Sequence, residues 1–214
     1  MTQPYNPLEK MNLGRSVAIA LLRGEVRPLS QTLQLSGAGV YAIYYTGDFE
    51  PYAPIAEANA EGRFQRPIYV GKAIPEGGRK GGLTTDAAAG RSLSNRLREH
   101  AGSIGQASNL RLEDFSYRCL VVDDIWIPLG ENMLIERFKP VWNTLIDGFG
   151  NKTPGAGRKA QARSSWDVLH PGRSFVDRLQ LAPGRRTVEE IVEALRLVYR
   201  GAEPQPLDGG PVET

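Results

Sequence analysis

The chain has 214 residues, of which 41% are hydrophobic and 23% charged, with 26 Lys and Arg against 24 Asp and Glu. This length and apolar content suit one globular domain and exclude a largely disordered chain. No apolar run reaches the ~18 residues of a membrane helix, and the N-terminal MTQPYNPLEK lacks the pattern of a signal peptide. The single cysteine, Cys119, excludes an internal disulfide and a cysteine zinc site, so we expect a soluble protein of a reducing compartment.

Charge is unevenly distributed along the chain, although its net value is only +2. Residues 148–186 carry eight basic and two acidic side chains, whereas residues 187–214 carry six acidic and two basic ones. Such segregation is typical of a protein with a surface that faces a polyanion. A solvated loop that happens to be basic is the alternative, and charge alone does not separate the two.

The N-terminal half of the chain predicts one helix and two strands. Residues 12–23 predict a short, mostly apolar helix. Residues 37–47 are β-branched and aromatic between glycines and predict a buried strand, and residues 67–71 predict a second one. The intervening residues 48–66 predict a loop with one or two helical turns, and residues 72–91 a long loop rich in Gly, Lys and Arg.

The following segment predicts two helices around a third strand. The first helix is expected to start at Ser92 or Ser94 as its N-cap and to end at Gly102. Residues 115–122 predict the strand. The second helix, over residues 130–138, must end before Pro140.

The C-terminal part divides into an arm, a helix and a tail. Residues 148–186 show little periodicity and many glycines and prolines, which predicts an extended arm. A capping box of Thr187 and Glu190 opens an amphipathic helix over residues 187–200. Residues 201–214 predict a frayed tail.

Glu131 is the first candidate functional residue, because it lies on an apolar stripe. It shares one helix face with Leu134, Ile135 and Phe138, where a carboxylate is costly unless it is paired or binds a metal. The alternative is an ordinary carboxylate at a helix start, which the helix dipole favours. Glu136 is expected to point outward as a surface acid.

Arg96 and His100 form the second candidate, since residues four apart share a helix face. A guanidinium beside an imidazole suits phosphate chemistry, because arginine offers a bidentate donor and histidine relays protons near neutral pH. A solvated helix edge is the alternative. Tyr41 and Tyr69, in the two N-terminal strands, would ordinarily be core aromatics.

The triplets Gly39-Val-Tyr41 and Tyr69-Val-Gly71 resemble the two defining motifs of the GIY-YIG nuclease family, with valine in place of isoleucine. Further elements follow in the family's order within about residues 37–147: Arg96, His100, Glu131 and the Asn143 of Lys139-Pro-Val-Trp-Asn143. The segment from Asp147 to Arg173 is similar to the branch of type II restriction endonucleases that cut short GC-rich palindromes. The spacing of 28 between the two tyrosines makes residues 48–66 an insertion.

The resemblance implies a mixed fold of helices and strands, α/β in the broad sense and α+β in the strict one. A small three-stranded antiparallel sheet is flanked by helices, and the site lies on one face. It implies a single nuclease domain over residues 1–214, with a core at about 37–147 and a basic DNA-binding arm at about 148–186. The implied activity is hydrolysis of phosphodiester bonds in both strands of double-stranded DNA with Mg²⁺, which Mn²⁺ can replace. A two-fold homodimer, a companion DNA methyltransferase, no membrane partner and a bacterial cytoplasmic location are expected with it.

The same resemblance assigns roles at the reacting phosphate. Glu131 would hold the metal, Arg96 would contact the scissile phosphate, and Tyr41 would be the general base. A tyrosine with an ordinary pKa of ~10 is a poor base at neutral pH, so His100, Lys72 or the metal must assist it.

Three further residues have supporting roles in this interpretation. Tyr69 would orient water or phosphate. Lys72 is either a second charge stabiliser or a solvated lysine. Asn143 would position the backbone around the site rather than touch the substrate.

Arginines and lysines are the expected readers of DNA in the arm, because they match the major-groove edge of guanine. Most of them would contact phosphates instead. His170 is expected to be structural rather than catalytic. The candidate DNA-binding residues are Lys152, Arg158, Lys159, Arg163 and Arg173.

Two other function classes stay open. One is a nicking nuclease of the repair or homing type, and the other is a catalytically silent DNA-binding protein with the same fold. A phosphate-binding loop is disfavoured, because Lys80 in the glycine-rich stretch is followed by Gly81 rather than Ser or Thr.

Overall fold

The structure is a computed structural model that describes residues 6, 8–31, 35–74, 90–151 and 161–201. Its strands are β1 (Arg27–Pro28), β2 (Gly39–Tyr45), β3 (Pro67–Ala73) and β4 (Phe115–Val121). Its α-helices are α1 (Lys10–Leu22), α2 (Ala53–Asn59), α3 (Ser92–Gln106), α4 (Ile127–Phe138), α5 (Val141–Thr144), α6 (Ser165–Leu169), α7 (Ser174–Arg178) and α8 (Val188–Gly201). Short 3-10 turns lie at Leu29–Gln31, Glu50–Tyr52, Ala60–Gly62 and Leu112–Asp114.

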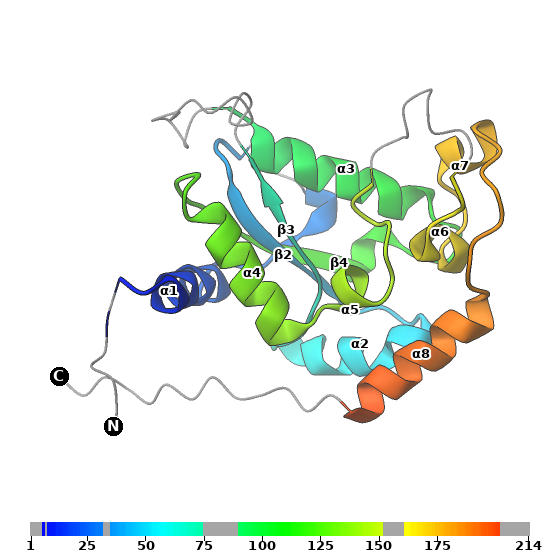
Figure 1. Cartoon of the computed structure of the whole chain (residues 1–214), viewed down its shortest axis with the longest axis horizontal. Helices are drawn as coiled ribbons and strands as arrows, with labels where there is room; N and C mark the ends of the chain where they lie inside the picture. Colours follow the sequence, from blue (N-terminus) through cyan, green and yellow to red (C-terminus); the bar gives the residue numbers. More distant parts are fainter. Residues whose placement is uncertain (1–5, 7, 32–34, 75–89, 152–160, 202–214) are drawn as a thin grey trace.

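The strands form one antiparallel sheet in the order β1-β4-β2-β3 (Figure 1). The three predicted strands are therefore confirmed, and the sheet has a fourth. β1 pairs only Arg27 and Pro28 with Tyr117 and Ser116 of β4. Two residues carry no period-2 pattern, so the sequence could not reveal this strand.

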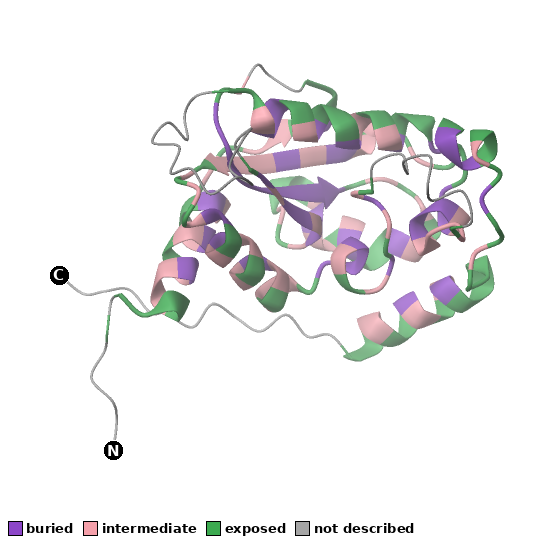
Figure 2. Cartoon of the chain, turned by 45° about the horizontal axis from the view of Figure 1, so that its top comes forward, coloured by how far each residue is buried: buried purple, intermediate pink, exposed green. Residues whose placement is uncertain are grey.

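Helices cover both faces of the sheet and bury all seven residues of β2 (Figure 2). One core cluster joins α1 and α4 to one face through Ala18, Leu21, Ile127, Leu134, Val40, Ala42, Tyr44 and Val70. The other cluster joins α3, α5, α6 and α8 to the opposite face through Leu97, Ile104, Trp142, Trp166, Ile191, Leu195, Tyr41, Ile43 and Tyr45. The fold is of the expected α+β class, with three layers.

α3 differs from its prediction at both ends. Arg91 occupies the N-cap position without a side-chain cap, so neither Ser92 nor Ser94 is the N-cap. The helix continues through Gly102 to Gln106, because Ile104 is fully buried against the core and its packing outweighs the low helix propensity of glycine.

α4 starts one turn earlier than expected and ends as expected. Pro128 stands in the first turn, where a missing N–H costs nothing. Lys139 adopts a left-handed conformation after Phe138, and Pro140 follows it. The early start moves Glu131 out of the first turn, so the helix dipole does not account for this carboxylate.

The expectation of an extended arm over residues 148–186 is wrong for its described part. α6 and α7 lie there, and Trp166 and Leu169 of α6 are buried in the core. Ser164 caps α6 by accepting a hydrogen bond from Asp167 N at 3.2 Å. Residues 152–160, like 75–89 of the predicted long loop and 202–214 of the predicted tail, lie outside the described residues.

The N-terminus of α8 confirms the predicted capping box. Glu190 Oε2 accepts from Thr187 N at 2.9 Å, and Thr187 Oγ1 accepts from Glu190 N at 3.3 Å. Ile191 and Leu195 are fully buried, so the apolar face of this helix packs on the core. Among the described helices, none is long and apolar enough to cross a membrane.

A buried polar cluster lies where α6 meets the 3-10 turn before α2. His170 Nε2 is 2.6 Å from Tyr52 Oη, and His170 Nδ1 is 3.0 Å from Asn109 Oδ1. Trp142 Nε1 donates to Tyr52 Oη at 2.8 Å. Burial, with a smaller effect of Arg173, lowers the pKa of His170 to about 3. The histidine is therefore neutral and structural, as predicted.

This cluster predicts a loss of stability in acid. His170 stays neutral in the fold but protonates below about pH 6.5 when unfolded, so protons favour the unfolded chain between pH 6.5 and 3. We expect the free energy of unfolding to fall by about 1.4 kcal/mol per pH unit from this residue alone. Urea titrations at pH 7.5, 6.5, 5.5 and 4.5 would measure it. His170→Gln should reduce the slope by about this amount and leave the contribution of the buried His100, and an unchanged slope would contradict the assignment.

Candidate nuclease site

The pairing of β2 with β3 brings the two conspicuous tyrosines together. Tyr41 pairs with Gly71 and Ile43 with Tyr69, and the two tyrosine rings lie 6.3 Å apart. A Cβ on Gly71 would overlap the hydroxyl and ring of Tyr41. The glycine of the second triplet is therefore required by the close approach of Tyr41 from the neighbouring strand.

Gly39, the glycine of the first triplet, permits a similar close approach on the other side of β2. A Cβ on Gly39 would overlap the carbonyl of Leu120 in β4. Both glycines thus permit close approach to a neighbouring group, and both triplets are packed against adjacent strands.

His100 of α3 lies against the Tyr41 hydroxyl. Tyr41 Oη and His100 Nε2 are 2.7 Å apart, and the two side chains are 0% and 1% exposed. Burial raises the pKa of Tyr41 well above its ordinary value and lowers that of His100 well below its own; Tyr69 adds to the first shift and Arg96 to the second. At neutral pH the pair is an uncharged phenol beside an uncharged imidazole. Because His100 is buried, it does not lie on a solvated edge of the helix.

Arg96 lies one turn before His100 on α3 and reaches toward the same tyrosines. Its Nη2 donates to the carbonyl of Gly150 at 2.8 Å, and its Nη1 pairs with Glu99 Oε2 at 2.8 Å. The guanidinium lowers the pKa of both Tyr41 and Tyr69, although burial outweighs it at each. With 23% of its side chain exposed, Arg96 can reach a ligand that Tyr41 cannot.

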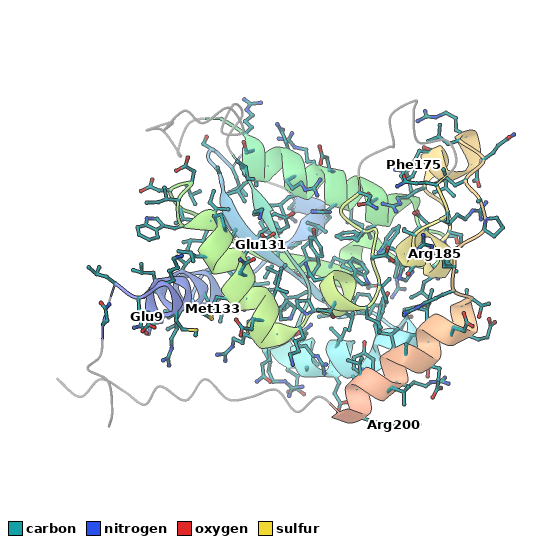
Figure 3. All side chains as sticks on the ribbon, viewed as in Figure 1. Glu9, Glu131, Met133, Phe175, Arg185 and Arg200 are labelled. Atoms are coloured by element: carbon teal, nitrogen blue, oxygen red, sulfur yellow. The ribbon has the colours of Figure 1, made fainter. Side chains whose placement is uncertain are left out.

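Lys72 and Glu131 form an ion pair beside the tyrosines. Lys72 Nζ is 2.6 Å from Glu131 Oε2, and the side chains are 34% and 15% exposed. The charge of Glu131 raises the pKa of both Tyr41 and Tyr69, which places the carboxylate within electrostatic reach of them. Figure 3 shows Glu131 on α4, the helix that lies beside the strands. Lys72 is therefore no isolated solvated lysine.

We expected the site to lie on one face of the sheet. The candidate residues instead lie on both sides of its edge. Side chains alternate along β3, so Lys72 and Val70 project to the α4 face while Tyr69 and Ala73 project to the α3 face. β3 is an edge strand of the described sheet. Groups from α3 and α4 can therefore meet beside it.

Asn143, in α5, holds the backbone of this edge strand. Its Oδ1 accepts from Val70 N and its Nδ2 donates to Val70 O, both at 2.8 Å. The amide thus replaces a missing neighbour strand between Tyr69 and Gly71. Asn143 thus contacts the backbone of the edge strand, as expected, and its role in the reaction stays a prediction.

The residues fit a hard cation with few protein ligands. Glu131 offers one partly exposed carboxylate, and Mg²⁺ is commonly held by one or two carboxylates together with water and phosphate oxygens. Among the described residues, no group of three or more His, Cys, Asp or Glu gathers to form a complete cage. A cation on Glu131 would replace Lys72 as its partner.

The residues expected to bind DNA differ in their exposure. Arg173 is 2% exposed and paired with Asp167, so the prediction that it contacts DNA is wrong. Arg163 is accessible, with 39% of its side chain exposed, and lies 3.6 Å from Asp177. Lys152, Arg158 and Lys159 lie outside the described residues.

Phe149 and Gly150 are site residues that sequence reasoning missed. The Phe149 ring stacks on His100 with centroids 4.5 Å apart and planes 16° apart, and Gly150 supplies the carbonyl that holds Arg96. An aromatic residue between two glycines, shortly after Asn143, was the available signal.

Comparison with protein families identifies the family to which the sequence is similar. The family model of the Eco29kI GIY-YIG domain matches residues 33–198, which is most of the chain. No curated protein matches. The match includes both triplets, Arg96, His100 and Glu131, and it continues through α6 and α7 into α8.

The packing of Tyr41 over Gly71 predicts opposite effects of two Gly→Ala substitutions. Gly71→Ala should destabilise the protein by about 1–3 kcal/mol, because the added methyl group displaces the Tyr41 ring. Gly102→Ala in α3 has open space and should stabilise it by about 0.5–1 kcal/mol. Urea unfolding of the two variants measures both. Equal effects would contradict the close approach.

Proposed function

Because the chain belongs to the Eco29kI GIY-YIG family of restriction endonucleases, we propose that it is a Mg²⁺-dependent type II enzyme that cleaves both strands of DNA at a short GC-rich palindrome. The observation that carries this proposal is the convergence of six side chains around the edge of β3. They supply a proton acceptor, cations for a phosphate and a carboxylate for a metal. They are Tyr41, Tyr69, Lys72, Arg96, His100 and Glu131.

Tyr41 and His100 form the proton-accepting pair in this mechanism. Water gives a proton to Tyr41 Oη while the phenol proton passes to His100 Nε2, so no free phenolate is needed despite the raised pKa of Tyr41. The resulting hydroxide attacks phosphorus, the bond to the 3′ oxygen breaks, and that oxygen takes a proton from solvent. Of the groups considered as helpers of Tyr41, His100 is the one in direct contact.

Arg96 and Lys72 neutralise the phosphate, and Tyr69 orients it. The Tyr41 hydroxyl is fully buried without DNA, and Arg96 interacts with it. We expect the guanidinium to turn onto the scissile phosphate when DNA binds, which opens the Tyr41 hydroxyl to the attacking water. Tyr69, which is only partly buried, is suited to contact the phosphate or that water.

Glu131 would hold the metal, for which Mn²⁺ can substitute. A bound Mg²⁺ stabilises negative charge on the phosphate and the departing oxygen. The role of Glu131 itself would be to hold the cation at the edge of β3, where Lys72 is now its partner.

Cleavage of both strands implies a two-fold homodimer, because one site in each chain cuts one strand. Arg163 is the described candidate for contacts with DNA outside the reacting phosphate. A site-specific nuclease also requires a companion methyltransferase that protects the DNA of its host.

Incubation of the protein with unmethylated phage DNA, in Mg²⁺ and in EDTA, tests the proposal. We expect discrete fragments in Mg²⁺ and intact DNA in EDTA. Glu131→Ala should lower the cleavage rate at least 100-fold, while the exposed Glu136→Ala, on the same helix, should cut at the parental rate. Nicked circles would favour the nicking nuclease. Intact DNA with shifted mobility would mean a DNA-binding protein without activity.

Removal of one hydroxyl tests the Tyr41–His100 pair. Tyr41→Phe should lower the cleavage rate by about 10²–10⁴-fold, the usual contribution of proton transfer, without loss of the fold. Tyr44→Phe is the matched control, because it removes a buried hydroxyl from the same strand on the opposite face, where Arg118 donates to it at 3.0 Å. Circular dichroism checks folding, and near-parental cleavage by Tyr41→Phe would return Tyr41 to a core role.

A further inference from the structure

Arg173, a buried arginine outside the candidate nuclease site, holds the backbone beside that site. Arg173 binds both oxygens of Asp167, with Nε–Oδ1 at 2.6 Å and Nη2–Oδ2 at 2.7 Å. The same guanidinium donates to the carbonyls of Gly148 at 3.0 Å and Phe149 at 3.3 Å. It also lies over the ring of Trp166, 4.6 Å from the ring centroid. One side chain therefore fixes two successive peptide groups.

Residues 147–150, which we name the Phe149 loop, are held by α6 as well. Trp166 N donates to the carbonyl of Asp147 at 2.9 Å, and Ser165 N donates to the Asp147 carboxylate at 3.1 Å. Gly148 has φ +102°, and a Cβ there would overlap the side chain of Ser164. The loop thus has one tightly defined path on α6.

The other side of the Phe149 loop contacts both catalytic residues of α3. The Phe149 ring stacks on His100, and the carbonyl of Gly150 accepts from Arg96. The Phe149 ring also meets the edge of Tyr69, with centroids 4.9 Å apart. A Cβ on Gly150 would lie 2.9 Å from Tyr69 Oη and 3.0 Å from Arg96 Nη2. The loop therefore sets the positions of the imidazole and the guanidinium together.

We propose that Arg173 is a positioning residue for the nuclease reaction, acting on Arg96 and His100 through the Phe149 loop. This inference rests on the proposed function of the site. The planar guanidinium is suited to the task, because it can bind a carboxylate bidentately and still donate to two carbonyls. A buried ion pair is also a poor way to gain stability alone, since apolar residues of similar volume often serve as well.

Arg173→Lys and Phe149→Leu test the proposal, with the exposed Arg178→Lys as a control in the same segment. Lysine keeps the charge opposite Asp167 but lacks the guanidinium fork, and leucine keeps the apolar volume without the flat ring. In single-turnover cleavage with excess protein, we expect the rate to fall 10- to 100-fold in both variants. The Kd for DNA without Mg²⁺ should stay within about threefold.

The chain contains only two histidines, so the position of His100 can also be followed without cleavage. Stacking on Phe149 shifts the imidazole proton resonances of His100, and we expect them to move toward ordinary values in Arg173→Lys and Phe149→Leu. Arg178→Lys should leave them in place.

The outcomes separate this inference from the proposed function. A lowered melting temperature with an unchanged cleavage rate and unchanged His100 resonances would make Arg173 merely structural and overturn the inference alone. A wild-type protein that cleaves no DNA in Mg²⁺ would overturn the proposed function, and with it the role of Arg173 in catalysis.

Discussion

The site depends on one buried hydrogen bond, between Tyr41 Oη and His100 Nε2 at 2.7 Å. The bond joins the centre of the sheet to α3, and it requires Gly71 on the neighbouring strand because the Tyr41 side chain lies over that residue. Burial keeps both partners uncharged, so the imidazole has an unprotonated nitrogen that can accept the phenol proton while Tyr41 takes one from water. The surrounding groups are arranged around this pair: Phe149 stacks on the imidazole, and Arg96 interacts with the phenol.

A second pair of the same composition shows what distinguishes a reactive pair from a structural one. Tyr52 and His170 are 2.6 Å apart and equally buried, but Trp142 and Asn109 occupy the remaining polar atoms of the pair. The partners around Tyr52 are thus fully supplied by the core. Tyr41 instead lies next to partly exposed charged groups, Arg96 and Glu131. Neighbouring charged groups that are themselves partly exposed, not the tyrosine–histidine contact itself, distinguish the Tyr41 pair.

Local patterns predicted most of the fold and part of the site. The three main strands, the end of α4 before Pro140 and the capping box of α8 follow from short-range rules, and the structure confirms them. Glu131 could be singled out because a carboxylate interrupted an apolar stripe. The 148–186 region could not be predicted in this way. Charge counting assigned Arg173 to DNA, whereas one of the two acids in that segment, Asp167, pairs with it and takes it into the core.

The ion pairs around the site are suited to exchange partners. Without DNA, Lys72 is paired with Glu131 and Arg96 with Glu99, and all four side chains retain some exposure. Exposed ion pairs contribute only ~0–1 kcal/mol each, and these partly exposed pairs can exchange partners more readily than a fully buried pair. In the proposed reaction, a metal would take Glu131 and a phosphate would take Lys72 and Arg96, so each of these three charges again has a partner. The carboxylates thereby keep the two cations in place until a polyanion arrives.

The deeply buried Arg173–Asp167 pair is different, because its groups are 2% and 4% exposed and removing either partner would leave an uncompensated charge in the core. The exposed pairs can therefore change during catalysis, while the buried pair keeps the Phe149 loop fixed.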